Sequence, residues 1–482
     1  MNKTFVLKSV FVLMALASFT SYGQQKKWTL QECVNYAIEH NISVKQSALD
    51  NQLAAIDKKG AIGNFLPSVN MSASHSWNIG LNQNITTGLL QNQTTQFTSA
   101  GASVGIDIYK GLQNVNTLNK ARLSVIAGQY KLLKMQEDVA LNVANAFLQI
   151  LFNKENLKVQ NEQLASNNRQ LERTTELVNA GVVPRGDLLD IKATVAGDMQ
   201  RVINAENVLL ISKLSLAQLL QLEDFEKFDV ADDKYDAVAS ATILEEPSAI
   251  YAKAKEQRTE LKVAKANLEI AEKDVAIAKG AYQPTIRGFY DFNTRAAYAD
   301  QVVGAVPNTE NPTTTIGYVQ GMPNQMVVRD NFTSVLGKPD AIFDQFDRNK
   351  GQTFGLSLNV PIFNGFSARN NVARSKVALD RSKIAYAQQE LDLERNVYTA
   401  FTDVKGSMKA YDAAISALEA REEALRYAKE RYDVGMMNAF DFNQAQTLYV
   451  NAQSEVLRTK YDYIFRVKIL DFYFGIPIIQ KN

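Results

Sequence analysis

The chain has 482 residues, a length that allows two to four ordinary domains and a sizeable hydrophobic core. Its 52 lysines and arginines nearly balance its 51 aspartates and glutamates, and the basic residues are scattered along the chain. Proteins that bind nucleic acid usually cluster their positive charge, so we expect no nucleic-acid partner.

The first residues have the pattern of a secretory signal peptide. Lys3 and Lys8 supply positive charge, an apolar stretch covers 10–19, and 21–23 includes small residues for cleavage. The apolar stretch is shorter than the about 20 residues that a bilayer requires, which argues against an uncleaved anchor. We therefore assign 1–23 to a signal peptide.

Cys33 is the only cysteine, which excludes internal disulfides and cysteine-rich metal sites. Bulky polar residues precede it, so we expect no lipidation and interpret it as a small buried residue of the first helix. Past the signal we find no apolar run long enough for a transmembrane helix. An exported chain of this kind is periplasmic, secreted, or inserted in the outer membrane as strands.

Apolar and polar residues alternate from residue 68 onward. In 68–79 the even positions are serine or asparagine, whereas the odd positions are apolar or aromatic apart from one histidine, and the alternation recurs over 99–108. A period of two indicates strands, and one apolar face over about 8 to 12 residues is typical of membrane barrel strands. We predict a strand pair at about 68–109.

A seven-residue apolar repeat then runs from Ile150 to Val178, a pattern that makes helices supercoil against their neighbours. Gly181 is expected to end this helix and Asp187 to begin the return. The sequence thus predicts a long helical hairpin at about 111–222. Seventy helical residues span about 105 Å, which suits a compartment to be crossed better than a compact domain.

The second half of the chain repeats the first. Tyr109 corresponds to Phe363 with an offset of 254 (363 − 109), and Pro67 corresponds to Pro284 with an offset of 217 (284 − 67). Internal repeats of this kind determine the architecture. The difference between the two offsets means that the second half carries 37 extra residues (254 − 217).

The repeat divides the mature chain into three segments. The first repeat covers 24–222, an acidic connecting segment covers 223–247, and the second repeat covers 248–476.

Within the second repeat we predict a strand pair at about 285–363 and a helical hairpin at about 365–476. The strand pair is interrupted by a long loop at 293–352, where several prolines and glycines predict an exposed, irregular segment.

Four amphipathic strands cannot close into a barrel. An open edge in hydrocarbon leaves unpaired backbone groups that cost several kcal/mol each, so the chain must oligomerise. Two copies would give eight strands, which side chains can fill, whereas three copies give twelve strands and leave an aqueous lumen. The sequence therefore predicts a homotrimer.

Two strand pairs and two helical hairpins in tandem resemble the TolC family of trimeric outer-membrane efflux proteins. The most specific marks are the strand-to-helix motif Val-Pro-Ile-Phe-Asn-Gly at 360–365, its echo at 107–111, and the helical turns at Gly181 and Gly435. The resemblance implies a mainly α fold with a membrane β-barrel, in which a trimer forms a twelve-stranded barrel and a periplasmic α-helical tunnel.

The same resemblance implies an outer-membrane location with a long periplasmic portion, in contact with outer-membrane lipid. Substrates would pass through passively, as in an efflux or type I secretion system. Energy would come from an inner-membrane pump of the RND or ABC type, joined through a periplasmic adaptor (membrane fusion) protein. It implies no cofactor and no metal.

The resemblance also assigns a gate at the periplasmic end. It implies that Asp187 and Tyr432 hydrogen-bond across the gate and that Asp441 forms a ring of carboxylates in the trimer. Met437 and Gln444 stand where the best-known pattern has an arginine and a second acid, so closure and cation selectivity are expected to be weaker or differently built. Independently of the resemblance, both acids fit helix N-terminal stabilisation, and Tyr432 fits a heptad position.

The adaptor is expected to contact the helical turns of both hairpins. By resemblance these turns contain Gly181 and Val182 in the first half, and Gly435, Met436 and Asn438 in the second.

Other functions fit the sequence less well. Two histidines, with no glycine-rich phosphate loop and no serine elbow, give little basis for an enzyme. A periplasmic coiled-coil scaffold or adhesion protein would explain the helices but not the amphipathic strands. A general diffusion porin would have no use for long helical hairpins.

Overall fold

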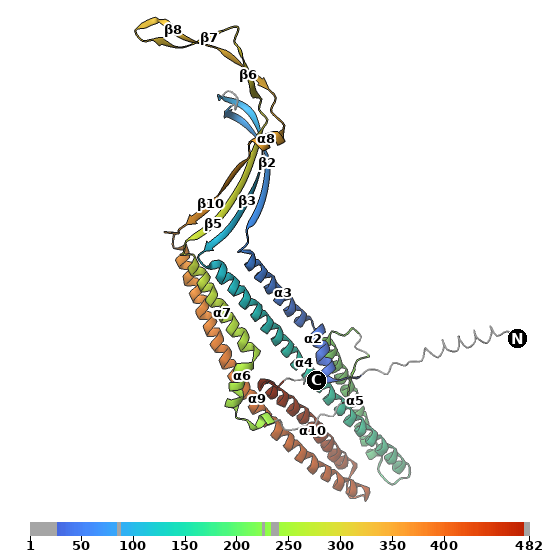
Figure 1. Cartoon of the computed structure of the whole chain (residues 1–482). Helices are drawn as coiled ribbons and strands as arrows, with labels where there is room; N and C mark the ends of the chain where they lie inside the picture. Colours follow the sequence, from blue (N-terminus) through green and yellow to red (C-terminus); the bar gives the residue numbers. More distant parts are fainter. Residues whose placement is uncertain (1–26, 84–87, 224–226, 233–240, 477–482) are drawn as a thin grey trace, which may run out of the picture. The chain divides into compact units, whose positions relative to one another are not determined.

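The computed structural model describes residues 27–83, 88–223, 227–232 and 241–476 (Figure 1). The predicted signal peptide lies outside the described residues. The first half contains β1 (Lys27–Trp28), α2 (Leu30–His40), α3 (Ile42–Gly63), β2 (Ser68–Gln83), β3 (Leu90–Lys110), α4 (Gln113–Asn179) and α5 (Arg185–Leu220).

The connecting segment contributes β4 (Asp229–Val230) and the 3₁₀ helix η1 (Ala241–Leu244). The second half contains α6 (Pro247–Gln257), α7 (Thr259–Gly280), β5 (Thr285–Ala297), β6 (Gln301–Pro307), β7 (Thr313–Val319), β8 (Met322–Asp330), β9 (Phe332–Gly337), α8 (Ile342–Arg348), β10 (Gly351–Asn359), α9 (Ser367–Asp433) and α10 (Ala439–Tyr473).

Corresponding elements of the two halves have matching lengths. Helices α4 and α9 both have 67 residues, α3 and α7 both have 22, and α2 and α6 both have 11. Their starting residues differ by 254 (367 − 113) and by 217 (259 − 42), the two offsets read from the sequence. The internal repeat is therefore a repeat of structure.

The chain divides into two compact units. One is helical and contains most of the four long helices. The other is formed by Asp57–Ala121 and Glu272–Val377 and contains the strands β2, β3 and β5 to β10. None of the helices in the described part of the chain combines the length and the apolar character that a membrane-spanning helix requires.

The main sheet has four antiparallel strands in the order β10-β5-β3-β2. Ser68 pairs with Gly105 in the first half, and Thr285 pairs with Asn359 in the second. These pairs are related by the same offsets (285 − 68 = 217 and 359 − 105 = 254), so the register of the two strand pairs is identical. Strand β3 joins the halves by pairing with β5, which leaves β2 and β10 at the edges.

The predicted irregular loop at 293–352 is wrong in its structure, although its exposure is as expected. Strand β5 continues to Ala297, and beyond it β6 pairs with β9 and β7 pairs with β8 as two antiparallel ribbons, followed by the short helix α8. Prolines usually indicate a loop, but a two-stranded ribbon has free outer edges, where a strand tolerates proline. Pro307 ends β6 and Pro323 is the second residue of β8, positions that such an edge tolerates.

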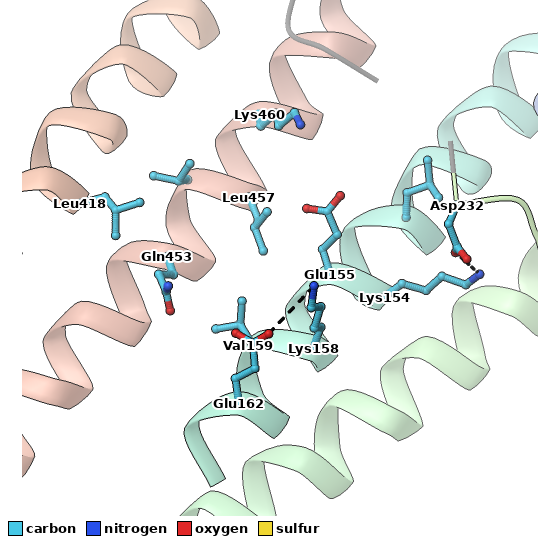
Figure 2. A pocket seen from close by; sticks show the side chains of 12 residues that line it. Lys154, Glu155, Lys158, Val159, Glu162, Asp232, Leu418, Gln453, Leu457 and Lys460 are labelled. Carbon is cyan, nitrogen blue, oxygen red and sulfur yellow. Dashed lines mark hydrogen bonds and ion pairs between the residues drawn. The ribbon is translucent and has the colours of Figure 1, made fainter. Parts of the chain in front are cut away.

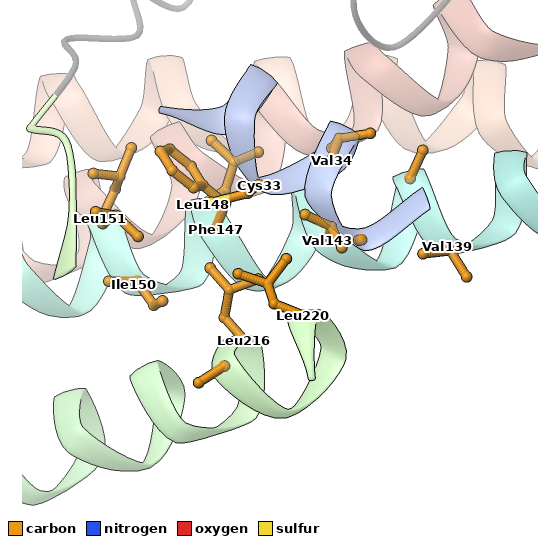
Figure 3. Packing of buried hydrophobic residues seen from close by; sticks show 14 of the residues in the cluster. Cys33, Val34, Val139, Val143, Phe147, Leu148, Ile150, Leu151, Leu216 and Leu220 are labelled. Carbon is orange, nitrogen blue, oxygen red and sulfur yellow. The ribbon is translucent and has the colours of Figure 1, made fainter. Parts of the chain in front are cut away.

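The helical unit is held by two hydrophobic clusters, each built mainly from one half. In the first, α2 and the end of α5 cover α4 around Phe147, which is fully buried (Figure 3). The second cluster uses equivalent residues of α6, α9 and α10. Equivalent pairs include Cys33 and Ile250, Ala37 and Ala254, Phe147 and Phe401, and Leu216 and Leu470.

The connecting segment is fastened to the first cluster by a parallel pairing of β4 with β1 and by ion pairs. Asp229 lies 2.9 Å from the Nζ atoms of both Lys154 on α4 and Lys213 on α5. Lys154 also reaches Asp232 at 2.8 Å, and Asp232 pairs with Lys27. The segment predicted as a connector therefore also braces the helices.

Candidate functional site

The open edges of the main sheet are the first functional feature. Within the described chain, β2 pairs only with β3, and β10 pairs only with β5. Apolar side chains on both edge strands are exposed, among them Met71 at 83%, Trp77 at 59% and Phe354 at 81%. Unpaired backbone groups and exposed apolar side chains on one sheet suit a barrel completed by further copies within lipid.

The tip of the first hairpin begins at Gly181, as predicted. Gly181 adopts φ +71° and donates its N–H to the carbonyl of Val178 at 3.0 Å, while Val182 donates to Leu177 at 2.9 Å. These two bonds form a Schellman motif, which satisfies carbonyls at the end of α4. Asp187 then lies in the first turn of α5, where the helix dipole favours an acid.

The tip of the second hairpin is built in the same way. Gly435 adopts φ +76° and donates to Tyr432 at 3.1 Å, and Met436 donates to Arg431 at 2.8 Å. Val182 and Met436 are equivalent, and they are 67% and 69% exposed. The two tips thus carry matching exposed apolar side chains.

The start of α10 is capped more strongly than the start of α5. The Oδ1 atom of Asn438 accepts from the N–H of Asp441 at 2.8 Å, and its Nδ2 donates to the Asp441 carboxylate at 3.0 Å. Asp441 is nevertheless exposed, and Gln444 lies exposed one turn further along. Met437 is half-buried in the turn. Pro184, at the equivalent cap of α5, makes no side-chain hydrogen bond.

The structure does not bring Tyr432 and Asp187 together within one chain. Gln170 on α4 donates to the Tyr432 hydroxyl at 2.7 Å, and the Tyr432 ring stacks on Phe442 with centroids 4.8 Å apart. Asp187 makes no side-chain hydrogen bond or ion pair with the described residues of its own chain. A bond between the two across neighbouring copies stays a prediction, and Gln170 becomes a competing partner for the hydroxyl.

A polar seam between α4 and the second hairpin escaped the sequence prediction. Its residues lie on long helices, where a single polar side chain has the pattern of an ordinary surface position. Only the contact with a partner on a distant segment shows that the side chain belongs to an interface between helices. The contacts join Glu155 to Tyr461 at 2.6 Å, Asn156 to Ser454 at 3.0 Å, Ser166 to Gln446 at 3.3 Å and Arg173 to Asp433 at 2.9 Å.

A cleft of about 820 Å³ lies at this seam and is lined by residues of α4, α9 and α10 and by Asp232 (Figure 2). Lys154 pairs with Asp232 at 2.8 Å and Lys158 with Glu162 at 4.0 Å, whereas residues such as Leu418 and Leu457 line it with aliphatic groups. Paired charges and aliphatic walls suit a seam between helices better than a catalytic cleft. In the described part of the chain, no group of three or more His, Cys, Asp or Glu side chains is arranged to hold a metal ion.

Comparison with known families matches two segments of the chain. The model of the family described as outer membrane efflux protein matches residues 33–221 and 250–475, one segment in each half.

Two curated relatives are similar over nearly the whole chain. The outer membrane protein TolC of Vibrio cholerae is 24% identical over 470 residues, which cover 96% of this chain and 93% of the relative. The outer membrane protein TolC of Escherichia coli is 20% identical over 461 residues, which cover 95% and 84%.

Solved structures share the fold. CusC superposes with a TM-score of 0.74 at 15% identity, covering 92% of this chain and 91% of CusC. The outer membrane channel CmeC of Campylobacter jejuni superposes with a TM-score of 0.73 at 17% identity, covering 93% and 86%. The predicted combination of long helical hairpins with an antiparallel sheet is confirmed by the structure and by these neighbours.

Proposed function

This chain belongs to the outer membrane efflux protein family, and we propose that three copies of it form a passive export conduit through the outer membrane. The observation that carries the proposal is the four-stranded sheet with two open edges, which is joined to two helical hairpins. Each hairpin has one helix of 67 residues and a second helix of 36 residues (α5) or 35 residues (α10). Three sheets supply the twelve strands that can enclose a lumen. The two 67-residue helices, α4 and α9, are about 100 Å long and extend the lumen into the periplasm.

The conduit works with a periplasmic adaptor and an inner-membrane pump of the RND or ABC type. The adaptor contacts the hairpin tips, where Val182 and Met436 offer exposed apolar side chains beside glycine turns. Because the conduit is passive, the pump selects the cargo and supplies the energy for its export.

The gate at the tips uses Asp187, Tyr432 and Asp441. Threefold symmetry turns the exposed Asp441 into a ring of three carboxylates, and Gln444 adds no second charge to it. Tyr432 exchanges its hydrogen bond between Gln170 and an acid of a neighbouring copy when the gate closes. This supports a gate that is held by fewer charges than the family resemblance implies.

The proposed function is tested in a strain that lacks the gene. We expect increased sensitivity to detergents, dyes or antibiotics, reversal by the intact gene, and recovery of an adaptor and a pump with the tagged protein. Unchanged sensitivity together with a protein found outside the outer-membrane fraction would favour a periplasmic scaffold instead.

Replacement of Asp441 tests the carboxylate ring. In planar bilayers, Asp441→Ala and Asp441→Asn should both reduce the preference for cations and the block by divalent cations. Asp441→Asn is the matched control for the cap, because its side-chain oxygen can still accept from Asn438. If only the alanine variant changed conductance, the effect would belong to the helix cap, and unchanged selectivity in both would exclude the ring.

A further inference from the structure

The nearly balanced charge of the whole chain includes a local excess of positive charge where the main sheet meets the helices. The end of α3, the start of α4, the end of α7 and the start of α9 all adjoin one end of the sheet, within one compact unit (Figure 1). The four segments concerned contain nine lysines and arginines but three acidic residues, a net charge of +6 (9 − 3). They are 57–66, 110–121, 272–284 and 360–377.

The opposite end of the sheet has no such excess. Residues 298–350, which include both ribbons, contain four basic and six acidic residues, a net charge of −2 (4 − 6), and the tip between β2 and β3 at 79–94 contains no charged residue. The positive charge is therefore confined to the end from which the periplasmic helices extend. An excess on one side only indicates an anionic partner on that side.

Most of this positive charge is unpaired. Lys110 pairs with Asp107 at 3.1 Å, and Lys120 pairs with Asp274 at 2.6 Å. Five other basic side chains are exposed and make no ion pair or hydrogen bond with the described residues. We call these five residues the basic collar: Lys59, Lys279, Arg369, Arg374 and Lys376.

The packing and stability of α9 do not account for its collar residues. Arg369 is the third residue of α9, whose first turn contains no acidic residue, although the helix dipole disfavours a positive charge at this end. Helix α9 packs on its own chain through Ala368 and Val372, which are buried. Arg369 and Lys376 are seven residues apart and exposed, so they share a different face.

Exposed aromatic side chains adjoin the collar. Between the strand ends and the helices, Tyr282 is 53% exposed, Phe363 76% and Phe366 57%. The guanidinium carbon of Arg369 lies 6.0 Å from the ring centroid of Phe366. Aromatic side chains at the end of a membrane sheet favour the level of the lipid headgroups. The collar therefore begins at the surface of the bilayer.

The collar is also short enough to act at that surface. Lys376 lies nine residues beyond Ser367, the first residue of α9, which is about 14 Å along the helix. Lys279 is the penultimate residue of α7, and Lys59 lies four residues before the end of α3. All five side chains are thus within about two Debye lengths of the ends of the helices at physiological salt.

We propose that the basic collar binds the headgroups of anionic phospholipids, of the phosphatidylglycerol class, in the periplasmic leaflet of the outer membrane. The inference rests on the outer-membrane conduit proposed above and adds the class of lipid that surrounds it. The partner is a lipid headgroup and not a free phosphate, because the exposed aromatic side chains beside the collar contact acyl chains only when the anion belongs to a lipid. Positive charges next to a membrane-embedded segment attract anionic lipid in this way.

Spin-labelled lipids measure this preference. The full-length protein is reconstituted in phosphatidylcholine vesicles that contain a trace of spin-labelled phosphatidylglycerol or of spin-labelled phosphatidylcholine. Electron paramagnetic resonance gives the fraction of each label that the protein immobilises. We expect phosphatidylglycerol to associate about 3–5 times more strongly than phosphatidylcholine at low salt, and we expect this ratio to approach one at about 0.5 M NaCl.

Neutralisation of the collar tests its residues. Lys279→Gln, Arg369→Gln and Lys376→Gln combined should bring the association ratio of the two lipids close to one. The charge-retaining combination Lys279→Arg, Arg369→Lys and Lys376→Arg should keep the parent ratio. Circular dichroism and the migration of the trimer on gels show whether each variant is folded and assembled.

Basic residues further along α9 provide a matched control. Lys409, Arg421 and Lys429 are also exposed and make no ion pair with the described residues. Lys409 lies 33 residues (409 − 376) beyond Lys376, about 50 Å along the helix and out of reach of the headgroups. Replacement of all three by glutamine removes the same charge and should leave the lipid preference unchanged.

Three results would overturn the proposal. If the neutralised variant kept the lipid preference, the collar would not be its source. If the charge-retaining variant lost the preference as fully as the neutralised one, packing and not charge would be responsible. If neutralisation changed the ion selectivity of the channel and left the lipid preference intact, the collar residues would face the lumen.

The collar and the conduit can fail separately. Channel activity in planar bilayers without any preference for phosphatidylglycerol would contradict the collar and leave the conduit in place. A salt-sensitive lipid preference in a protein that conducts no ions and whose loss leaves drug sensitivity unchanged would contradict the conduit and leave the collar in place.

Discussion

At the scale of single residues, burial determines the chemistry of Cys33. The sequence predicted a small buried residue of the first helix, and Cys33 is fully buried on α2 against α4 and α5. Burial raises the pKa of its thiol to about 12, chiefly through desolvation. The thiolate is therefore scarce at neutral pH.

We predict that a maleimide labels Cys33 in the folded protein at least about a hundredfold more slowly than in the urea-unfolded chain. Labelling followed by mass spectrometry gives both rates at one pH. Rapid labelling of intact trimers would show that α2 opens on the labelling timescale.

Tyr432 is the residue for which sequence and structure give different partners. A resemblance can place an aromatic near a gate, but the family pattern does not specify a glutamine on another helix. Gln170 lies 262 positions away from Tyr432 in the sequence, and nothing in the heptad pattern marks it.

Two variants separate the two partners of Tyr432. Tyr432→Phe removes both hydrogen bonds and should raise the resting conductance of the closed channel. Gln170→Leu removes only the bond seen in the protomer, which leaves the hydroxyl free for Asp187 and should lower or preserve the resting conductance. Equal increases in both variants would show that the bond with Gln170 is the one that holds the gate.

At the scale of elements, the sequence predicted best what is local and repeated. Glycine turns, heptads and alternating strands are encoded in short windows, and the repeat doubled the signal for each. The ribbons β6–β9 and β7–β8 were missed, because prolines and glycines that usually mark loops are also tolerated at free edges. A Cβ atom added to Gly111 would lie 2.2 Å from the carbonyl oxygen of Gly280. This close approach was missed because the two glycines are 169 residues apart (280 − 111).

The glycine turns allow a prediction with opposite signs at two positions. Gly435→Ala should destabilise the protein by about 1–2 kcal/mol, because alanine is strained at φ +76° although its Cβ has free space. Gly406→Ala, in the middle of α9 and equally free of contacts, should stabilise it by about 0.5–1 kcal/mol. Thermal unfolding by circular dichroism compares both with the parent; the same sign for both would contradict this account of the turn.

At the scale of the whole molecule, the connecting segment forms ion pairs with both the start and the end of the first half. Asp232 pairs with Lys27, and Asp229 pairs with Lys213 on α5. Burial raises the pKa of Asp229, but hydrogen bonds and charges of Lys213 and Lys154 outweigh it and leave the pKa below its usual range. Hydrogen bonds from Lys154 and Lys27 likewise lower the pKa of Asp232. A lowered folded-state pKa stabilises the fold above the unfolded pKa, and this contribution disappears as the pH falls through the folded value.

We therefore predict that Asp229→Asn reduces stability by about 1–3 kcal/mol at pH 7 and that the difference from the parent shrinks below about pH 4. Asp232→Asn is the matched control: its side chain is 56% exposed, against 17% for Asp229, so its effect should be smaller. Thermal unfolding from pH 7 to pH 3 gives both curves. A difference that stayed constant with pH would mean that charge is not its cause.

The overall assembly could be predicted only in part. Four strands with open edges required partners, and strand number favoured three copies. The contacts between copies could not be read from the sequence, because they depend on which side chains of two folded copies meet. The family resemblance supplied direction and partners, which neither heptads nor strands encode.

The hydrophobic clusters, each drawn mainly from one half, predict an order of events during biogenesis. We expect export with the N-terminus first, and the buried residues of the first cluster come from 33–230 except for Tyr461 and Ile464. The first helical hairpin can therefore pack against α2 and close on β4 before residue 250 has left the translocation channel. Strand β3, in contrast, pairs with β5 of the second half, so the helices of the first half can pack before the four-stranded sheet is complete.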